Sequence, residues 1–453
     1  MRGGVEMRTQ AVEVEANESP RIAVVAHSHP SLTKGGAEIA AFTLYNGLRA
    51  AGCEAIFIAA CADESRGKLS LGSDNEYAVF VRGDLFEHFF QLGSAQVGEE
   101  LERILRARGI HVVNFHHFTN LGLGALRRIR ALPDLKMAFT IHEFLAICHN
   151  HGQMVTTVGQ RLCERESIGA CAGCFPSMTR QDFVFRKKMF LETLRAFDVL
   201  IAPSIFLAER FCEWGLERDR FSVIENGLAH LPIVSASQNA DKRGAWTFGF
   251  FGQINPFKGV DVVIDAAELL HKSSVANVKI RLHGNLIGQS EQFVARFREA
   301  CASGLVEYVG PYDNHSVARL MADCDYVLTP SRWWENSPVV IQEAFAVGCP
   351  VLCSGVGGMA EKVKDGVSGK HFRLGDAADL ARCMIEAASE DTYFQLIEGL
   401  PKPFDATEMA RRYLAAFAGR RQAPPPPVVA ADGQLITFGV PDALTARHVE
   451  MEC

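Results

Sequence analysis

The sequence predicts an α/β protein built from two doubly wound, Rossmann-like domains. Short apolar, β-branched runs alternate with longer helical patterns, which is typical of parallel sheets covered by helices on both faces. The alternation stops at a polar, turn-rich segment, residues 231–245, and then starts again. At 453 residues and 48% hydrophobic composition, the chain is also longer than a single hydrophobic core usually supports.

The apolar runs predict strands on both sides of this polar segment. Before it, the expected strands span residues 21–26, 54–60, 77–81, 111–115, 136–141 and 198–203. After it, they span residues 246–252, 278–284, 306–310, 325–330 and 350–354. Helical patterns separate the runs, so we expect the strands of each half to form one parallel sheet.

The domain boundaries follow from this pattern and from changes in composition. Residues 1–20 form an acidic, polar leader, and residues 422–453 form a Pro-rich, irregular tail that we expect to be mobile. Between them we expect an N-terminal domain (21–230) with a Cys-rich insertion (148–174), a linker (231–245), a C-terminal domain (246–400) and a last helix (401–421).

Charge and hydropathy limit the partners of the chain. The formal net charge is −7 and no long basic run occurs, which argues against nucleic acid as a partner. No apolar stretch reaches about 18 residues, and the leader lacks the apolar region of a secretory signal, so we expect a cytoplasmic protein. Several of the 13 cysteines lie in apolar runs, where buried free thiols are the usual state.

Two glutamates flank a predicted helix start in the stretch TPSRWWENSPVVIQEAF, residues 329–345. An Asn or Ser cap followed by Pro338 at the first helical position predicts this start, which presents free N–H groups at the carboxyl end of a strand. Such an end binds phosphate. Glu335 lies just before the start and Glu343 inside the helix, roughly 10 Å apart along the axis. A ligand with a sugar, a diphosphate and a ribose would engage all three features, whereas either glutamate alone would be read as a cap or a solvated position.

The spacing of Glu335 and Glu343, E-x7-E, resembles the signature of retaining nucleotide-sugar glycosyltransferases of family 4, which have the two-domain GT-B fold. Three further stretches of the second half resemble the family: FGQINPFKGVD (251–261), the segment 308–331, and SGVGGMAEKVKDGVSGKHF (354–372). In the first half the resemblance is thinner and rests on residues 31–52 and on VVNFHHF, residues 112–118.

The resemblance implies a role for each matching residue. Glu343 would hold the ribose hydroxyls, Glu335 a hydroxyl of the transferred sugar, and Lys258 the diphosphate. The stretch from Ser337 through Val340, which includes Pro338 and Val339, would offer backbone N–H groups to the diphosphate, and Asn336 would also bind the donor. The family usually has Arg where this chain has Gln253, so one expected cation is missing unless Arg332 replaces it.

The implied reaction needs fixed positive groups and no divalent metal. When the bond between the anomeric carbon and the nucleoside diphosphate breaks, negative charge develops on the leaving phosphate, and aimed donors together with Lys258 lower the barrier. The resemblance implies attack on the same face with retention of configuration, the leaving phosphate helping to take the acceptor proton. The implied partners are a nucleotide-sugar donor and a glycan, lipid-linked or small-molecule acceptor.

The first half offers a glycine pair and three histidines at strand ends. Gly35 and Gly36 precede a helix, where the lack of Cβ lets backbone approach a ligand closely. His116 and His117 follow one strand and His142 follows another, so all three are expected near the cleft. A histidine at such a place is more often structural, but the family resemblance favours His117 as a contact to the sugar or the acceptor.

Four cysteines of the insertion, Cys148, Cys163, Cys171 and Cys174, form a candidate metal site. A C-x2-C pair with two cysteines upstream could hold a structural zinc ion or an iron-sulfur cluster, with His149 or His151 as substitute ligands. The alternative is four free or occasionally oxidised thiols. A bound metal would fold a loop above the acceptor side and take no part in chemistry.

A basic, aromatic helix follows the insertion at residues 179–197. It mixes Arg180, Arg186, Lys187 and Lys188 with Phe183, Phe185 and Phe190, a composition that could lie on anionic lipid. The alternative is a core-facing helix with a solvated basic face. Peripheral membrane contact is therefore one of two open interpretations.

Other functions remain as alternatives to sugar transfer. An epimerase, a phosphorylase or a non-catalytic nucleotide-sugar-binding protein would use the same fold, and the Gln253 departure favours the last. A nicotinamide-dependent dehydrogenase is discounted because no G-x-G-x-x-G opens a helix after a strand. A glycosidase is discounted because its two carboxylates must flank a single bond.

Overall fold

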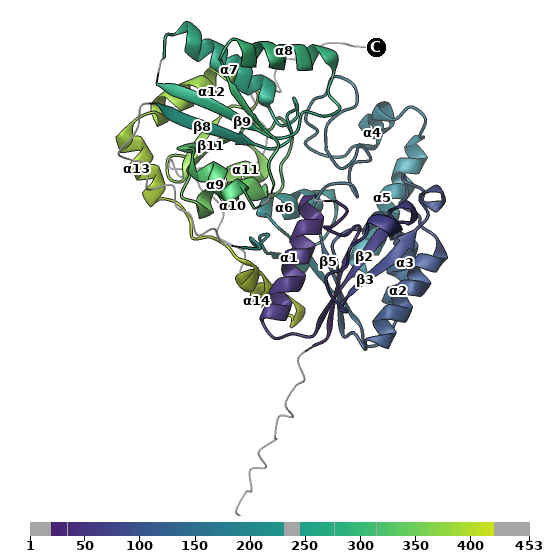
Figure 1. The fold of residues 1–453 in the computed structure, drawn as a ribbon. Helices are drawn as coiled ribbons and strands as arrows, with labels where there is room; N and C mark the ends of the chain where they lie inside the picture. The colour runs from purple at the N-terminus through teal and green to yellow at the C-terminus, as the bar shows by residue number, and fades with distance from the viewer. Residues whose placement is uncertain (1–19, 34, 231–244, 276, 314, 421–453) are drawn as a thin grey trace, which may run out of the picture.

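The computed structural model describes residues 20–33, 35–230, 245–275, 277–313 and 315–420 (Figure 1). The expected mobile tail and, but for one residue each, the expected leader and linker lie outside these ranges. The remaining chain forms two α/β domains, each organised around its own parallel sheet.

The first domain contains a seven-stranded parallel sheet in the order β3-β2-β1-β4-β5-β6-β7. The strands are β1 (Ile22–Ala26), β2 (Ala55–Ala62), β3 (Glu76–Val81), β4 (Val112–Phe115), β5 (Lys136–Thr140), β6 (Val199–Ala202) and β7 (Phe221–Val223). The helices are α1 (Gly36–Ala50), α2 (Ala95–Ala107), α3 (Leu123–Arg130), α4 (Ile168–Cys174), α5 (Arg180–Arg195) and α6 (Ile205–Trp214). The order reverses at β1, so the loops after β1 and β4 meet at a topological switch point, where ligands bind in such sheets.

The second domain contains a six-stranded parallel sheet in the order β10-β9-β8-β11-β12-β13. The strands are β8 (Trp246–Phe251), β9 (Val278–His283), β10 (Glu307–Gly310), β11 (Tyr326–Thr329), β12 (Val351–Ser354) and β13 (Gly369–Phe372). The helices are α7 (Val260–Lys272), α8 (Glu291–Ala302), α9 (Val317–Ala322), α10 (Val339–Ala346), α11 (Gly357–Lys362), α12 (Ala377–Ala387) and α13 (Glu390–Glu398). Its switch point lies between β8 and β11.

The last helix of the described chain, α14 (Ala406–Phe417), returns to the first domain and packs along α1 (Figure 1). Its buried Met409 and Tyr413 join the apolar cluster on one face of the first sheet. Gly47 of α1 lies so close to the backbone oxygen of Ala406 that a Cβ at this position would clash. Packing of the two helices therefore depends on a glycine at residue 47.

The two domains also contact each other directly. The carboxylate of Glu361 on α11 accepts hydrogen bonds from the backbone N–H groups of Ile205 and Phe206 at the start of α6, each at 2.8 Å. The apolar core continues across this contact, because Phe206 and Trp334 belong to one buried cluster. These contacts hold the carboxyl ends of the two sheets opposite each other.

All the strands predicted from the sequence are present, and the two-sheet architecture is confirmed. The edge strands β7 and β13 were not predicted, since one has three residues and the other, GKHF, is half polar. Among the described residues, no helix is both long and apolar enough to cross a bilayer.

Candidate functional site

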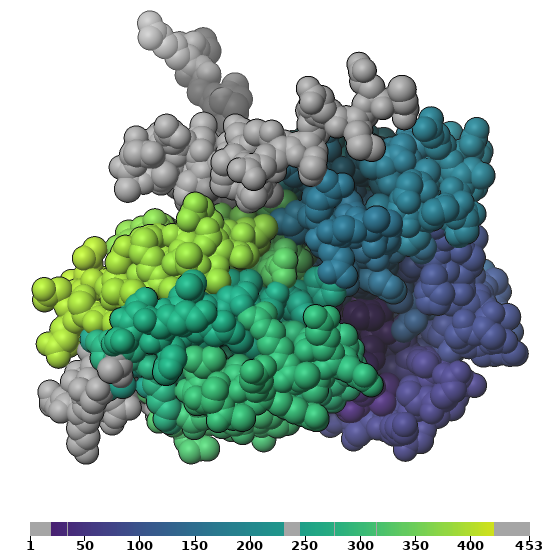
Figure 2. Space-filling model, turned by 90° about the horizontal axis from the view of Figure 1, so that it is seen from above, coloured from purple at the N-terminus to yellow at the C-terminus, as the bar shows by residue number. Residues whose placement is uncertain are grey.

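A cavity of about 620 Å³ lies between the two domains, at the carboxyl ends of their strands. Figure 2 shows the corresponding recess between the green second domain and the purple and blue first domain. A cavity of similar size, about 650 Å³, lies instead around the starts of β5, β6 and β7. Ligands of doubly wound sheets bind at the carboxyl ends, so the interdomain cavity is the candidate site.

Most residues predicted from the sequence line this cavity. They are Gly36, His117, His142, Lys258, Glu335, Asn336, Ser337, Pro338, Val339, Val340 and Glu343. Gly35, Gln253 and Arg332 were predicted for the site but are absent from its wall. The structure thus joins the first-domain loops to the E-x7-E segment across a single cleft.

Glu335 lies at the centre of a compact polar cluster. Its Oε1 accepts hydrogen bonds from Lys258 Nζ at 2.5 Å, Trp333 Nε1 at 2.7 Å and Ser331 Oγ at 2.8 Å. Burial alone would raise the pKa of Glu335, but Lys258 and these donors outweigh it, so the pKa is lowered. All three bonds end on Oε1, which leaves Oε2 without a hydrogen bond from the described residues and free for a ligand.

Lys258 reaches Glu335 because its loop makes a tight turn. Gly259 caps α7 with a φ of 78°, and a Cβ there would clash with the backbone oxygen of Pro330. The Lys258 backbone N–H also donates to Asn255 Oδ1 at 2.8 Å. The loop after β8 is therefore held against the loop after β11, with the Lys258 ammonium at the cavity wall.

Helix α10 begins one residue later than predicted. Pro338 is the residue before the first helical position and Val339 is that position, so the expected Asn or Ser cap is wrong. No side chain caps the helix, and Ser337 Oγ is buried without a hydrogen bond among the described residues. Because Pro338 has no N–H, the amides available to a diphosphate are those of Ser337, Val339 and Val340.

Glu343 lies one turn inside α10 and faces the same cavity. Its carboxylate has no hydrogen bond or ion pair among the described residues, and burial raises its pKa to about 7. A half-buried acid without a partner is costly, so its presence needs an explanation. Ribose hydroxyls would supply the missing donors.

The cation expected near the diphosphate is not replaced by Arg332. Its guanidinium pairs with Asp261 at 2.6 Å and its side chain is 49% exposed, away from the cavity. Gln253 also lies outside the wall, where its Oε1 accepts from Asn255 at 3.4 Å. Among the described residues, Lys258 is the one Lys or Arg side chain that lines the cavity.

The three histidines have different places. His117 lines the cavity, and its Nδ1 accepts from the Thr119 backbone N–H at 2.9 Å, which places the proton on Nε2, 3.3 Å from Glu143. His116 is buried behind the wall, bonded to His142 at 2.8 Å, so the expectation that it faces the cleft is wrong. Burial and the neighbouring His117 lower the pKa of His142 to about 3, which keeps it neutral.

The four cysteines of the insertion lie within one loop and α4, each partly buried and none in a disulfide. No group of three or more His, Cys, Asp or Glu side chains in the described part of the chain is arranged to hold a metal ion. Cys163 Sγ instead donates to the backbone oxygen of Arg165 at 3.2 Å. Zinc or cluster binding stays a prediction, which metal analysis of the purified protein would test.

Helix α5 has the core-facing arrangement that the sequence left open. Phe183, Phe190 and Arg186 are buried, and Arg186 donates to the backbone oxygens of Phe89 and Ala146 at 2.8 and 2.6 Å. Phe185, in contrast, is 61% exposed. The buried arginine is a structural tie of the insertion, while the outer face remains open to solvent.

Several residues of the site carried no assigned role in the sequence. Trp333 and Ser331 hold Glu335, and Glu143 pairs with His117. On the opposite wall, Glu38 of α1 lies 3.5 Å from His27, whose ring centroid is 4.4 Å from that of His117. In the sequence, the adjacent Trp333 and Trp334 were the available signal. Trp333 bonds to the nearby Glu335, but Trp334 bonds to Cys163, which is distant in the chain.

Two facing Rossmann-like domains with a polar interdomain cavity define a GT-B protein, and solved structures agree. Anabaena Alr3699/HepE in complex with UDP and glucose is similar with a TM-score of 0.61 and 17% identity over 88% of this chain and 99% of that chain. Sucrose-phosphate synthase from Thermosynechococcus elongatus is similar with a TM-score of 0.65 and 17% identity over 88% of this chain and 100% of that one. At this identity the likeness shows the fold alone.

Family models identify the chain more closely. The model described as Glycosyltransferase Family 4 matches residues 34–230, and the model described as Glycosyl transferases group 1 matches residues 245–390. The chain therefore belongs to the family 4, group 1 glycosyltransferases.

Curated relatives match part of the chain. D-inositol 3-phosphate glycosyltransferase of Nocardia farcinica is 30% identical over 196 residues, 41% of this chain and 43% of the relative. Phosphatidyl-myo-inositol mannosyltransferase of Mycobacterium leprae is 28% identical over 234 residues, 50% of this chain and 60% of the relative. The chain thus matches roughly half the length of these relatives.

Proposed function

We propose that this protein transfers a hexosyl group from a nucleotide sugar to an acceptor hydroxyl, with retention of anomeric configuration. One observation carries the proposal: Glu335, Lys258, the uncapped start of α10 and the unpartnered Glu343 line a single interdomain cavity. In this arrangement Glu335 Oε2 receives a sugar hydroxyl, the α10 amides and Lys258 receive the diphosphate, and Glu343 receives the ribose.

Bond breaking follows from this placement. As the bond from the anomeric carbon to the phosphate oxygen breaks, the electron pair and negative charge go to the leaving phosphate, which Lys258 and the α10 amides stabilise. The acceptor hydroxyl attacks from the same face and passes its proton to the leaving phosphate. The scheme needs no divalent cation, so EDTA should leave the transfer rate unchanged.

His117 supplies a hydrogen-bond donor on the acceptor side of the cavity. The Thr119 N–H fixes the ring with its proton on Nε2, and Glu143 at 3.3 Å orients it. A hydroxyl of the sugar or the acceptor can bridge this N–H and the Glu143 carboxylate, accepting from the first and donating to the second, without proton transfer to His117. Replacing His117 by Gln, which keeps a donor, should therefore cost less activity than replacement by Ala.

The acceptor is a glycan, a small molecule or a lipid-linked sugar, and α5 favours testing the last. Phe185 and Val184 are 61% and 48% exposed, and the Lys188 side chain beside them is 69% exposed. Exposed aromatic and basic side chains on one helix suit the surface of anionic lipid. Sedimentation with phosphatidylglycerol vesicles should detect binding of the parent protein that Phe185→Ser weakens. Equal binding of the parent and the variant would contradict membrane contact through α5.

The transfer itself is tested with purified protein and a panel of nucleotide sugars, beginning with UDP-glucose. A donor that binds the native state raises the melting temperature, and release of nucleoside diphosphate should then depend on an added acceptor. NMR of the product reports the anomeric configuration. Glu335→Gln should bind UDP like the parent and lose transfer.

Other results of the same assay would favour an epimerase, a phosphorylase or a binding protein instead of a transferase. Turnover of donor without an acceptor indicates an epimerase, and turnover that requires inorganic phosphate indicates a phosphorylase. Binding of nucleotide sugar without turnover in the presence of every acceptor tried indicates a binding protein. An inverted product would leave transfer standing and overturn retention.

A further inference from the structure

Trp334, the neighbour of Glu335, belongs to the second domain but is buried against the first. Its side chain is 5% exposed, and its ring centroid lies 5.4 Å from that of Phe206 on α6. The indole Nε1 donates a hydrogen bond to the backbone oxygen of Cys163 at 3.1 Å. The donor-side loop is therefore bonded to the Cys-rich insertion of the opposite domain.

Arg210 of α6 contacts both Trp334 and the insertion. Its guanidinium lies 5.1 Å from the Trp334 ring centroid and donates to the backbone oxygen of Glu164 at 2.7 Å. The same side chain thus holds both the indole and the insertion residue that follows Cys163. A cation over the face of an indole is an attractive arrangement, and it is stronger when water is excluded.

The insertion presents the Cys163 oxygen on an ordered turn. Cys163 N–H donates to the Met154 oxygen at 2.7 Å, and Thr156 N–H donates to the Arg161 oxygen at 2.9 Å, which closes a hairpin. Such a hairpin fixes the carbonyl that receives the indole. The hairpin therefore holds in place the Cys163 backbone oxygen that accepts the Trp334 hydrogen bond.

The residue after Glu335 is bonded across the cleft as well. Asn336 Nδ2 donates to the backbone oxygen of His142 at 3.0 Å, and Gly358 N–H donates to the Glu335 oxygen at 2.7 Å. The backbone on both sides of Glu335 is therefore fixed by contacts that its own side chain does not make. The side chain is left to face Lys258 and the cavity.

We propose that Trp334 is a positioning residue for Glu335, and that the insertion 148–174 acts on the donor site through the Trp334–Cys163 hydrogen bond. The insertion is then part of the machinery that places the sugar-binding carboxylate, and not only a cover for the acceptor side. Where transfer is the readout, this proposal rests on the proposed function.

The test is Trp334→Phe, which keeps an aromatic ring and removes the N–H donor. Loss of one buried hydrogen bond predicts a roughly tenfold lower kcat/KM for UDP-glucose. Affinity for UDP alone should not change, because the α10 amides and Glu343 are untouched. Trp214→Phe is the matched control: Trp214 is equally buried, and its Nε1 has no hydrogen-bond partner in the described chain.

A double-mutant cycle separates positioning from general damage. If Trp334 acts through Glu335, Trp334→Phe should cost little further affinity for UDP-glucose in a Glu335→Gln background. Equal costs in both backgrounds would overturn the proposal. Should Trp334→Phe fail to fold, Arg210→Gln removes the cation above the ring and the bond to Glu164, and it should give the same pattern.

Hydrogen exchange of residues 331–336 in the free protein can be measured without a sugar donor. Exchange there should rise in Trp334→Phe and stay unchanged in Trp214→Phe. An unchanged exchange rate in Trp334→Phe would overturn the proposal, whatever activity the protein has. A rise in a protein that transfers no sugar would instead overturn the proposed function and leave the positioning role intact.

Discussion

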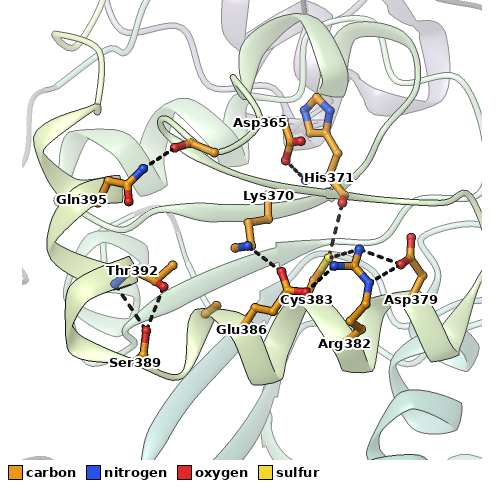
Figure 3. Close-up of polar contacts among 12 residues, drawn as sticks. Asp365, Lys370, His371, Asp379, Arg382, Cys383, Glu386, Ser389, Thr392 and Gln395 are labelled. Carbon is orange, nitrogen blue, oxygen red and sulfur yellow. Dashed lines mark hydrogen bonds and ion pairs between the residues drawn. The ribbon is translucent and has the colours of Figure 1, made fainter. Parts of the chain in front are cut away.

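Two clusters of carboxylates and cations in the second domain look alike in composition and differ in use. On β13 and α12, Arg382 pairs with Asp379 and Glu386, and Lys370 pairs with Glu386 at 2.7 Å (Figure 3). In the cavity, Lys258 pairs with Glu335 at 2.5 Å. Hydrogen bonds from Lys370 and Arg382 lower the pKa of Glu386, and Lys258 helps to lower that of Glu335.

What separates the two clusters is the set of groups left without partners. The α12 cluster lies at the surface, where the Arg382 and Glu386 side chains are 54% and 42% exposed, and Lys370, Asp379, Arg382 and Glu386 each have an ion-pair partner. Beside the Lys258–Glu335 pair, a free carboxylate oxygen, uncapped amides and the unpartnered Glu343 face one cavity. Unsatisfied groups, rather than charge itself, mark the functional site.

The largest expected effect comes from removing the cavity cation. Lys258→Ala should lower kcat/KM by about a hundredfold to a thousandfold, because the developing phosphate charge loses its side-chain cation. Lys258→Arg should recover part of the activity. Steady-state kinetics with UDP-glucose measures both, and a loss of less than tenfold would remove Lys258 from the mechanism.

Displacing the loop that carries Glu335 and Asn336, by adding a side chain at Gly358 of α11, should have the next largest effect. Gly358 lies so close to the backbone oxygen of Asn336 that a Cβ would clash. Gly358→Ala should therefore lower the free energy of unfolding by about 1–3 kcal/mol and weaken UDP-glucose binding. Gly124→Ala in α3, with no atom near its Cβ position, is the control and should not destabilise. Equal unfolding curves for the two variants would contradict the close packing.

The third effect is a pH dependence that Glu343 confers on nucleotide binding. Ribose hydroxyls donate to the ionised carboxylate, whose pKa is raised to about 7 in the free protein. Affinity for UDP should therefore hold above pH 7 and fall by up to about tenfold per unit below it. Calorimetry from pH 5.5 to 8.5 measures this, with Glu343→Gln as a variant that should lose the slope.

Stability should respond to Glu343 in the opposite sense. Because its folded pKa lies above its unfolded value, burying the ionised acid costs stability, and the cost is fully present only above pH 7. Glu343→Gln should thus raise the melting temperature at pH 8 and have less effect toward pH 5. A constant difference across this range would show that the carboxylate does not titrate near neutrality.

The smallest effect is expected in the surface cluster. Arg382→Ala should change the free energy of unfolding by about 1 kcal/mol or less and leave kcat/KM unchanged, since exposed ion pairs are weak. Unfolding in urea and the UDP-glucose assay measure the two quantities. A loss of activity comparable to that of Lys258→Ala would erase the distinction between the two clusters.

The sequence predicted the fold better than it predicted individual contacts. Apolar periodicity is local, so the predicted strands appeared where expected, while the short edge strand Phe221–Val223 gave no pattern to detect. The position of the α10 start near Pro338 was predicted to within one residue from local propensity. Such features depend on neighbours in the chain.

Contacts between distant segments could not be predicted in this way. Arg332 was a candidate phosphate ligand by type, but Asp261, 71 residues away, holds it at the surface. Trp334 gave no hint that its indole meets Cys163, 171 residues away. Partners of this kind are decided by the approach of two folded domains, which no local pattern contains.

The return of α14 to the first domain has a consequence for biosynthesis. Residues 406–417 cover apolar side chains of α1 and β1, so a nascent chain that has emerged only to residue 230 exposes that surface. The half made first is completed by a helix that begins 176 residues after residue 230. Until then its uncovered face is a site for a chaperone or for aggregation.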